Sequence, residues 1–132
     1  MSSMKRLLEE LASVRVLLNQ NPMAMAYGYK IGDQLQLAVE YVADNVNPLS
    51  LITRRFDGLV PAAMAAVLED AFEQLNIDNP QTWWAQLYRE NRHRSLSVGD
   101  VITVGDRAYA CAAVGWSEVP MPATDTTRDY TL

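Results

Sequence analysis

The spacing of hydrophobic residues changes along the chain, and the first segment has the spacing of a helix. Apolar residues recur at intervals of three and four from Met4 to Leu18, which places them on one helical face. The stretch from Asn19 to Pro22 ends this pattern. Because amphipathic helices usually bury their apolar face, we expect a helix that packs on the core, and binding of a partner is the alternative.

A period of two follows and predicts a β-hairpin. Apolar side chains alternate with polar or small ones from Met25 to Ile31, and again from Leu35 to Tyr41. Gly32-Asp33 lies between the two runs as a two-residue loop, where glycine accepts the positive φ that such turns require. We therefore expect a hairpin that closes at Gly32-Asp33.

Two later segments have helical patterns. Apolar residues repeat at i, i+3, i+4 and i+7 between Pro61 and Leu75, and proline is typical of the first helical turn. The acidic residues of this segment and Gln74 fall on the opposite face, which we expect to be solvated. A second helix is predicted behind Asn79, which we expect to cap it, and Pro80.

The second of these helices is rich in aromatic residues. Trp83, Trp84 and Tyr88 share one side of about three turns, together with Leu87. Aromatic side chains at this spacing are typical of a core that packs against a sheet. A ligand pocket or exposed surface formed by these three aromatic residues and Trp116 is the alternative.

The segment after residue 95 predicts a second hairpin and a last strand. Val101 to Val104 and Arg107 to Val114 alternate, and Gly105-Asp106 joins them as a two-residue loop. A short strand is expected at Ser117 to Val119. A phosphate-binding loop does not fit, because a strand rather than a helix follows each Gly-Asp pair and no lysine lies nearby.

Together these patterns predict the fold class α+β. We expect one domain over residues 1–119, in which about three helices pack on an antiparallel sheet built from two β-hairpins and a short last strand. Residues 120–132 are expected to form a flexible C-terminal tail. The chain of 132 residues is 49% hydrophobic and 20% charged, which suits a single core of this kind.

Charge and composition limit the classes of partner that the protein is expected to bind. A net charge of −5 disfavours a broad electrostatic hold on DNA or RNA. The single cysteine, Cys111, forms no internal disulfide. No apolar stretch approaches the roughly 20 residues of a membrane span. We therefore expect a cytoplasmic protein that does not bind membranes.

Candidate catalytic and metal-binding residues are few. His93 is the only histidine and Cys111 the only cysteine, whereas a metal site needs several convergent ligands. A Cys-His nucleophilic pair is formally available, but Cys111 lies within an apolar strand, where cysteine behaves as a small hydrophobe. We expect no cofactor, no metal and no enzymatic activity, and we rank an enzyme as the third hypothesis.

Basic residues gather just behind the aromatic helix. Residues 56–88 hold five acids and no Lys or Arg, and the basic segment follows at once. The arginines are expected either to complement the helix C-terminus and pair with Glu69, Asp70 or Glu73, or to recognise a phosphate or an acidic partner. For the second case the candidate binding residues are Arg89, Arg92, His93, Arg94, Ser95 and Ser97.

Several positions between residues 71 and 119 carry a resemblance to a known family. They are Phe72, Leu75, Asn76, Pro80, Tyr88, Arg89, the run from Arg94 to Val101, Tyr109, Cys111, Gly115 and Trp116. The segment resembles the YodL-type domain of large polyvalent proteins from plasmids, phages and other mobile elements, and its Ser-Leu-Ser-Val-Gly-Asp core is the most specific part. The resemblance implies a mobile-element context and no established chemistry. A weaker similarity, through Val98 to Ile102, is to small β-barrel modules that bind RNA or modified DNA.

The sequence therefore favours a non-enzymatic, protein-binding accessory module of a plasmid or phage. We expect it to modulate a host nucleic-acid-processing or defence complex, since a small acidic protein can occupy a basic groove. The alternative is a nucleic-acid-binding module that uses the loop from Arg89 to Arg94. The sequence identifies neither the partner nor the oligomeric state.

Overall fold

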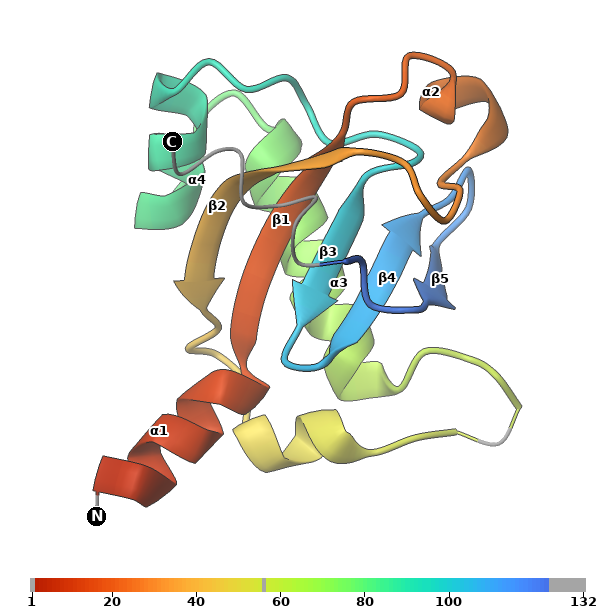
Figure 1. The fold of residues 1–132 in the computed structure, drawn as a ribbon. Coiled ribbons are helices and arrows are strands. Elements are labelled where there is room, and N and C mark those ends of the chain that lie inside the picture. Colours follow the sequence, from red (N-terminus) through yellow and green to blue (C-terminus); the bar gives the residue numbers. More distant parts are fainter. Residues whose placement is uncertain (1, 56, 124–132) are drawn as a thin grey trace.

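The centre of the protein is a five-stranded antiparallel sheet (Figure 1). The computed structural model describes residues 2–55 and 57–123. The strands are β1 (Ser13–Asn19), β2 (Leu35–Val42), β3 (Val101–Val104), β4 (Arg107–Cys111) and β5 (Trp116–Val119). They lie in the order β2-β1-β3-β4-β5, so the strand nearest the N-terminus pairs with both β2 and the C-terminal hairpin.

Helices pack on one face of this sheet and at its ends. They are α1 (Ser2–Leu11), α2 (Ala24–Tyr27), the 3-10 helix η1 (Pro48–Ile52), α3 (Ala62–Asn76) and α4 (Trp83–Glu90). Figure 1 shows α3 behind the strands, and α1 projecting from the lower end of the sheet beside η1. The expected α+β class is confirmed, with consecutive antiparallel pairs β1-β2 and β3-β4 and a short last strand. None of the helices described is long and apolar enough to cross a membrane.

Two hydrophobic clusters lie on opposite faces of the sheet. The larger one joins the strands to the helices and includes Leu68, Trp84 and Tyr109. The smaller one consists of Leu17, Leu35, Val101, Ala108 and Ala110. Side chains of β4 alternate between the two clusters, as the period of two predicts.

The helix predicted up to Leu18 is too long. Helix α1 ends at Leu11, and residues 13–19 form β1. In the sequence, Val14, Val16 and the two leucines that follow fit either period, because a strand buried on both faces is apolar nearly throughout. Pairing with β2 on one side and β3 on the other decides between the two.

The first predicted hairpin is only half correct. Strand β2 forms as expected, but its partner is β1 instead of residues 25–31. Residues 24–27 form α2, and Gly32-Asp33 lies in the loop that leads into β2. Met25, Tyr27 and Ile31 are 67%, 67% and 79% exposed, so their alternation buries no common face.

The connection between α3 and α4 corrects two smaller predictions. Gln74 is buried instead of solvated, and its side-chain oxygen accepts hydrogen bonds from the backbone N–H groups of Gln81 and Thr82, at 2.8 and 3.2 Å. Thr82, rather than Asn79, caps α4. Trp84 and Tyr88 are buried, whereas Trp83 is 62% exposed. The buried face of α4 therefore includes only some of the aromatic residues that the sequence places on one side.

The second hairpin forms around Gly105-Asp106 as predicted, although its second strand ends at Cys111 instead of Val114. Gly105 has a φ of +62° and donates its N–H to the carbonyl of Ser13 at 2.9 Å. A Cβ atom at this position would lie 3.1 Å from the carbonyl oxygen of Leu11. The turn thus needs glycine both for its backbone conformation and for its contact with the end of α1. Of the tail expected over 120–132, residues from 124 onward lie outside the described ranges.

We predict that Gly105→Val lowers the free energy of unfolding by about 1 kcal/mol or more. Gly115→Val is the matched control, because Gly115 also has positive φ but no atom lies within 4 Å of an added Cβ. Chemical denaturation of both variants measures the difference. Equal losses would show that the contact with Leu11 contributes nothing.

Candidate binding site

A buried carboxylate organises the region around the basic loop. Asp100 precedes β3, and its side chain is fully buried. Arg94 donates to both carboxylate oxygens at 2.7 Å, and the backbone N–H groups of Asn19 and Ser97 each donate at 2.8 Å. These bonds join the end of β1, the loop after α4 and the turn before β3. A buried charge needs such pairing and hydrogen bonding to be tolerated.

The guanidinium of Arg94 is occupied by this network. It also donates to the carbonyl of Asn19, the carbonyl of Ser95 and the hydroxyl of Ser97, each at 3.1 Å. Hydrogen bonding to Asp100 raises the pKa of Arg94, and the negative charge of Asp100 adds to this effect. Partial burial of Arg94 opposes the shift. Arg94 and Ser97, two of the candidate binding residues, are thus engaged with Asp100.

The other two arginines of the loop have different surroundings. Arg89 donates to the carbonyl of Ile77 at 3.0 Å and lies 3.8 Å from the Asp78 carboxylate on the surface. Arg92 is exposed; its backbone N–H donates to the carbonyl of Arg89 at 2.9 Å, but its side chain makes no hydrogen bond or ion pair with the rest of the described chain. Among the described residues, Arg89 thus pairs with Asp78 and Arg94 with Asp100. The expected pairing of these arginines with Glu69, Asp70 or Glu73 is therefore wrong.

The acids of α3 have other neighbours than the arginines of the loop. Glu69 accepts a hydrogen bond from the indole N–H of Trp116 at 3.2 Å. Burial raises the pKa of Asp70, and the neighbouring charges of Glu73 and Asp44 add to the shift.

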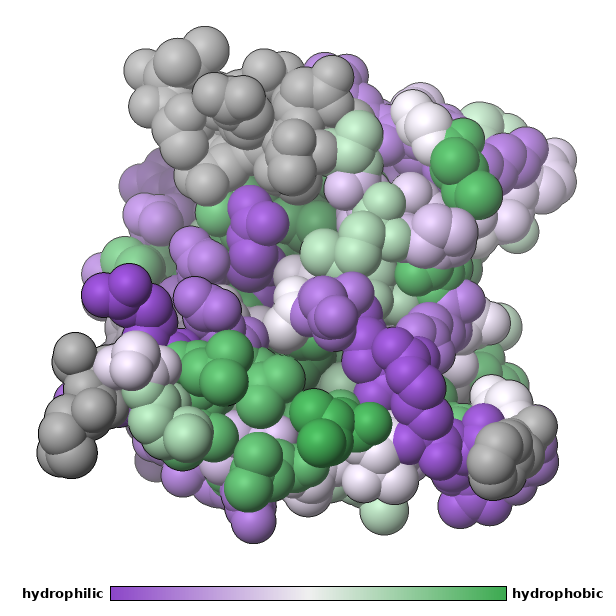
Figure 2. Space-filling model, turned by 60° about the horizontal axis from the view of Figure 1, so that its bottom comes forward, coloured by the Kyte–Doolittle hydropathy of each residue, from purple (hydrophilic) through white to green (hydrophobic). Residues whose placement is uncertain are grey.

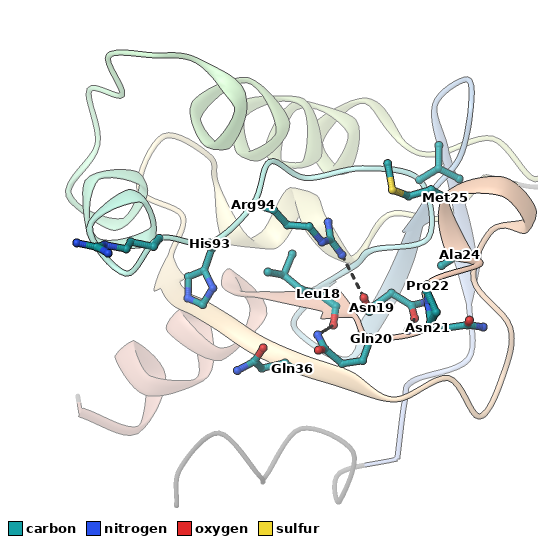
Figure 3. Close-up of a pocket in the computed structure, with 12 residues that line it drawn as sticks. Leu18, Asn19, Gln20, Asn21, Pro22, Ala24, Met25, Gln36, His93 and Arg94 are labelled. Carbon is teal, nitrogen blue, oxygen red and sulfur yellow. Dashed lines mark hydrogen bonds between the residues drawn. The ribbon is translucent and has the colours of Figure 1, made fainter.

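A hollow of about 370 Å³ lies beside the loop. Three separate segments line it: residues 18–22, 24 and 25 at and after the end of β1, Gln36 on β2, and residues 92–94 and 98. Figure 3 shows His93 and Gln36 at one end and Ala24 and Met25 at the other. The structure thus brings the candidates Arg92, His93 and Arg94 together with residues far away in the sequence.

Hydrogen bonds among polar side chains fix one wall of the hollow. The Asn19 side chain donates to Asp33 at 3.0 Å and to the carbonyl of Gly99 at 2.9 Å. Asn21 donates to the other oxygen of Asp33 at 3.1 Å. Desolvation alone would raise the pKa of Asp33, but the bonds from Asn19, the Lys30 N–H and Asn21 bring it below its ordinary value. The wall is therefore preorganised around an ionised carboxylate.

Three polar side chains at the hollow are open to a ligand. No hydrogen bond joins the side chains of Gln36, Arg92 or His93 to another described residue. The ring of His93 lies 5.0 Å from that of Tyr88, whose hydroxyl donates to the Arg94 carbonyl. Burial lowers the pKa of His93, so its imidazole is neutral at pH 7 and can both donate and accept a hydrogen bond.

The candidate aromatic residues do not gather in one pocket. Trp84 stacks on Tyr41 in the core, with ring centroids 3.9 Å apart. Trp116 packs edge-on against Phe72 at 6.3 Å. Trp83 is exposed on another side of α4, and Tyr88 supports the loop behind the hollow. The core interpretation holds for Trp84 and Tyr88.

The candidate nucleophile lies in the sheet. Cys111 is buried at the end of β4, and burial raises the pKa of its thiol to about 11, with further contributions from Asp100 and Glu69. Over the described residues, no group of three or more His, Cys, Asp and Glu side chains is placed to hold a metal ion.

Comparison with known proteins gave no match to any family model, to any curated protein or to any solved structure. The resemblance of residues 71–119 to YodL-type domains thus remains a prediction.

Sequence reasoning missed Asn19, Gln36 and Asp100 as parts of this site. A signal was present for two of them, because Asn19 ends an apolar run and Asp100 directly precedes a buried strand. Polar residues at such positions have to find buried partners. The partner of Asn19 lies 81 positions away, and nothing in the local sequence indicates that distance.

We predict that Arg94→Ala lowers the free energy of unfolding by about 2–4 kcal/mol, because it leaves the Asp100 charge buried without its ion-pair partner. Arg89→Ala removes an arginine whose ion pair is exposed and is expected to cost about 0–1 kcal/mol. Urea denaturation at neutral pH compares the two. Similar small losses would contradict the structural importance of the Arg94–Asp100 pair.

We predict that Cys111 reacts slowly with a thiol reagent in the native protein, since the reactive thiolate is suppressed by burial and a raised pKa. Labelling should become fast in denaturant, and Cys111→Ser should remove it. Rapid labelling without unfolding would instead support a nucleophilic function.

Proposed function

We propose that the protein is a non-enzymatic binding module that captures another protein through the hollow beside residues 92–98. The observation that carries this proposal is the combination of a rigid, internally bonded wall with three unengaged polar side chains. Gln36 and His93 offer neutral hydrogen-bonding groups, and Arg92 offers a cation. We expect an extended segment of the partner to bring backbone or carboxamide groups to Gln36 and His93, and a carboxylate to Arg92.

The backbone at Arg92 supports a binding role for this residue. Its φ is +63°, and no other non-glycine residue in the described chain has positive φ. Arg92 comes directly after Asn91, the C-cap of α4, at a position where glycine or asparagine is the usual choice. An arginine here costs conformational energy, and such strain is common at sites where a side chain serves binding.

Exposed apolar side chains adjoin the hollow and favour a protein as the partner. Met25 lines it and is 67% exposed. Met23 and Tyr27, from the same short segment, are also largely exposed. Flexible methionines and aromatic rings around a polar centre are typical of protein-binding surfaces.

The biological setting of the proposal comes from the sequence. The resemblance of residues 71–119 to YodL-type domains supports an accessory protein of a plasmid or phage. A net charge of −5 supports action on a host nucleic-acid-processing or defence complex, whose surfaces carry basic grooves. Arg92 would then anchor an acidic group beside such a groove.

We predict that replacing Arg92 separates binding from stability. Arg92→Gly should retain or raise the free energy of unfolding, by up to about 1 kcal/mol, because glycine relieves the positive φ. The same change, and Gln36→Ala, should abolish capture of the partner by the tagged full-length protein from lysate of its native cell. Arg54→Gln is the matched control, since Arg54 is an exposed arginine on a different surface, paired with Glu118.

Capture that is unaffected by Arg92→Gly and Gln36→Ala would contradict the proposed site. The nucleic-acid alternative is tested with labelled DNA and RNA oligonucleotides at physiological salt. We expect weak binding, because Arg94 and Arg89 already face Asp100 and Asp78. Sub-micromolar affinity that falls steeply with salt, and less steeply in the Arg92→Gly variant, would favour the alternative.

A further inference from the structure

Strand β2 is one edge of the sheet, and part of its backbone has no neighbouring strand to bond to (Figure 1). The N–H of Ala43 donates to the carbonyl of Ala12 at 2.9 Å, in register with the pairing of β1 and β2. In antiparallel pairs, bonded and non-bonded positions alternate, so the N–H and C=O groups of Glu40 and Val42 point away from β1. Among the described residues, none bonds to these outward groups. Such groups are a template for an added strand.

Little in β2 protects this edge. Proteins usually protect an open edge with proline, lysine or a covering element. Strand β2 contains neither proline nor lysine, and the carboxylate of its one charged residue, Glu40, lies 3.7 Å from the guanidinium of Arg15 on β1. The register with β1 skips Ala38, which marks a bulge that bends the strand. An added strand is therefore expected to bond mainly at Glu40 and Val42, beyond the bulge.

Helix α4 forms an apolar wall beside the edge. Trp84 stacks on Tyr41 of β2, and Ala85 lines a small cavity together with residues of α3. At about 3.6 residues per turn, Trp83 and Leu87 lie on the flank of α4 opposite to Ala85, away from α3. Because Trp84, between the two flanks, contacts the outermost strand, this second flank lies on the outer side of β2. Trp83 and Leu87 are 62% and 41% exposed there.

The edge ends beside an apolar surface. Val42 shares a hollow of about 450 Å³ with Met4 and Leu8 of α1. Met4 and Leu7 are 60% and 54% exposed, and Figure 2 shows hydrophobic side chains gathered over this end of the molecule. Backbone pairing therefore stops at Val42, where side chains of α1 replace the strand edge.

The two ends of this edge carry opposite charges. At one end, Gln36 lines the hollow that Arg92 also lines. At the other end, Asp44 follows the strand, and its charge and that of Glu73 add to the effect of burial in raising the pKa of Asp70. No hydrogen bond or ion pair joins these three carboxylates to another described residue. Like charges crowded without a cation favour a positively charged group of a partner.

A buried hydroxyl beside these carboxylates also lacks a partner. Tyr41 is 5% exposed, and its hydroxyl makes no hydrogen bond with a described residue. Burial raises the pKa of this hydroxyl, and the charges of Asp70 and Asp44 add to the shift. Buried polar groups normally have a hydrogen-bond partner. A lysine or arginine placed between the carboxylates and the hydroxyl would donate to both.

We infer that an extended segment of the partner adds as a strand to the edge of β2, with a lysine or arginine at Asp70 and a carboxylate at Arg92. Its alternate side chains then pack against Trp83 and Leu87. This inference rests on the proposed function, since both use Arg92.

The geometry of β2 sets the order and spacing of the two charges in the partner. Antiparallel pairs are slightly more stable than parallel ones, so the cation precedes the carboxylate in the partner's chain. Val42 follows Gln36 by six residues, which is about 20 Å along a strand. The cation and the carboxylate are therefore about six residues apart.

Two synthetic peptides with the same residues in opposite order are the probes. Acetyl-Lys-Thr-Val-Thr-Val-Thr-Asp-amide has the inferred order, and acetyl-Asp-Thr-Val-Thr-Val-Thr-Lys-amide is the control. Titration into the isotope-labelled full chain, followed by NMR, measures both dissociation constants. We expect the first peptide to bind at least about tenfold more tightly. When about nine-tenths of the protein is bound, hydrogen exchange of the Glu40 and Val42 amides should slow about tenfold, whereas the Tyr41 amide, already bonded to β1, should change little.

Two double variants of equal charge test the acidic end of the edge. Asp70→Asn/Glu73→Gln removes two of the carboxylates and should weaken binding of the first peptide about threefold or more. Glu10→Gln/Asp106→Asn removes the same charge at the hollow between α1 and the turn at Gly105, and should leave binding unchanged. Circular dichroism checks that both variants remain folded.

The inference is overturned if the first peptide causes no NMR shift at millimolar concentration, if it binds without slowing the Glu40 and Val42 amides, or if the reversed peptide binds as tightly. Slowing of these amides with rising protein concentration and no peptide would also overturn it, in favour of pairing between two copies. Peptide binding that depends on Arg92 but leaves the edge amides unprotected would contradict only the added strand. Partner capture that Arg92→Gly and Gln36→Ala leave unchanged would instead contradict the proposed function itself.

Discussion

The bonds to the Asp100 carboxylate hold together three separate parts of the chain. Through Asn19 they fix the end of β1, through Arg94 the loop after α4, and through Ser97 the turn into β3. The carboxylate is fully buried, so its charge has to be matched inside the protein. Such a network adds specificity more than stability, because it is satisfied in only one arrangement of the three segments.

The candidate binding site depends on this arrangement. Arg94 donates to the carbonyls of Ser95 and Asn19 and so ties the loop that carries His93 to the end of β1, while the Asn19 side chain joins the same network to Asp33. Gly99 supports it from behind, since an added Cβ there would lie 2.6 Å from the Cβ of Ala24 in α2. A partner that meets Gln36, Arg92 and His93 therefore meets a surface that is already ordered, which lowers the entropic cost of binding.

The segments that sequence predicted well are those whose patterns are local. Helix α3 and the hairpin at Gly105-Asp106 need only a neighbouring period and a turn. Strand β1 was missed because its apolar run fits a helix as well, and pairing with β2 on one side and with β3, some 85 positions later, on the other makes it a strand. The sequence showed that positive charge is concentrated in the loop. It did not show that Arg94 would pair with Asp100 instead of an acid of α3.

The exposed apolar face of α1 was only partly predictable from the sequence. The amphipathic pattern of α1 was clear, and the expectation that it would pack on the core followed from what such helices usually do. Since residues 13–19 leave the helix to form the central strand, α1 is short and placed at the end of the sheet, where little core remains to cover it. The exposure of Met4 and Leu7 thus follows from the topology rather than from the local sequence.

Hydrogen exchange of the amide groups bound to Asp100 is the most direct test that this buried pair organises the protein. The N–H groups of Asn19 and Ser97 both donate to its carboxylate at 2.8 Å. If the network opens only when the domain unfolds, both amides should be protected by close to the full free energy of unfolding. Exchange of either amide at the rate of an exposed loop would show that the hydrogen-bond network around Asp100 opens locally, and would contradict the preformed site.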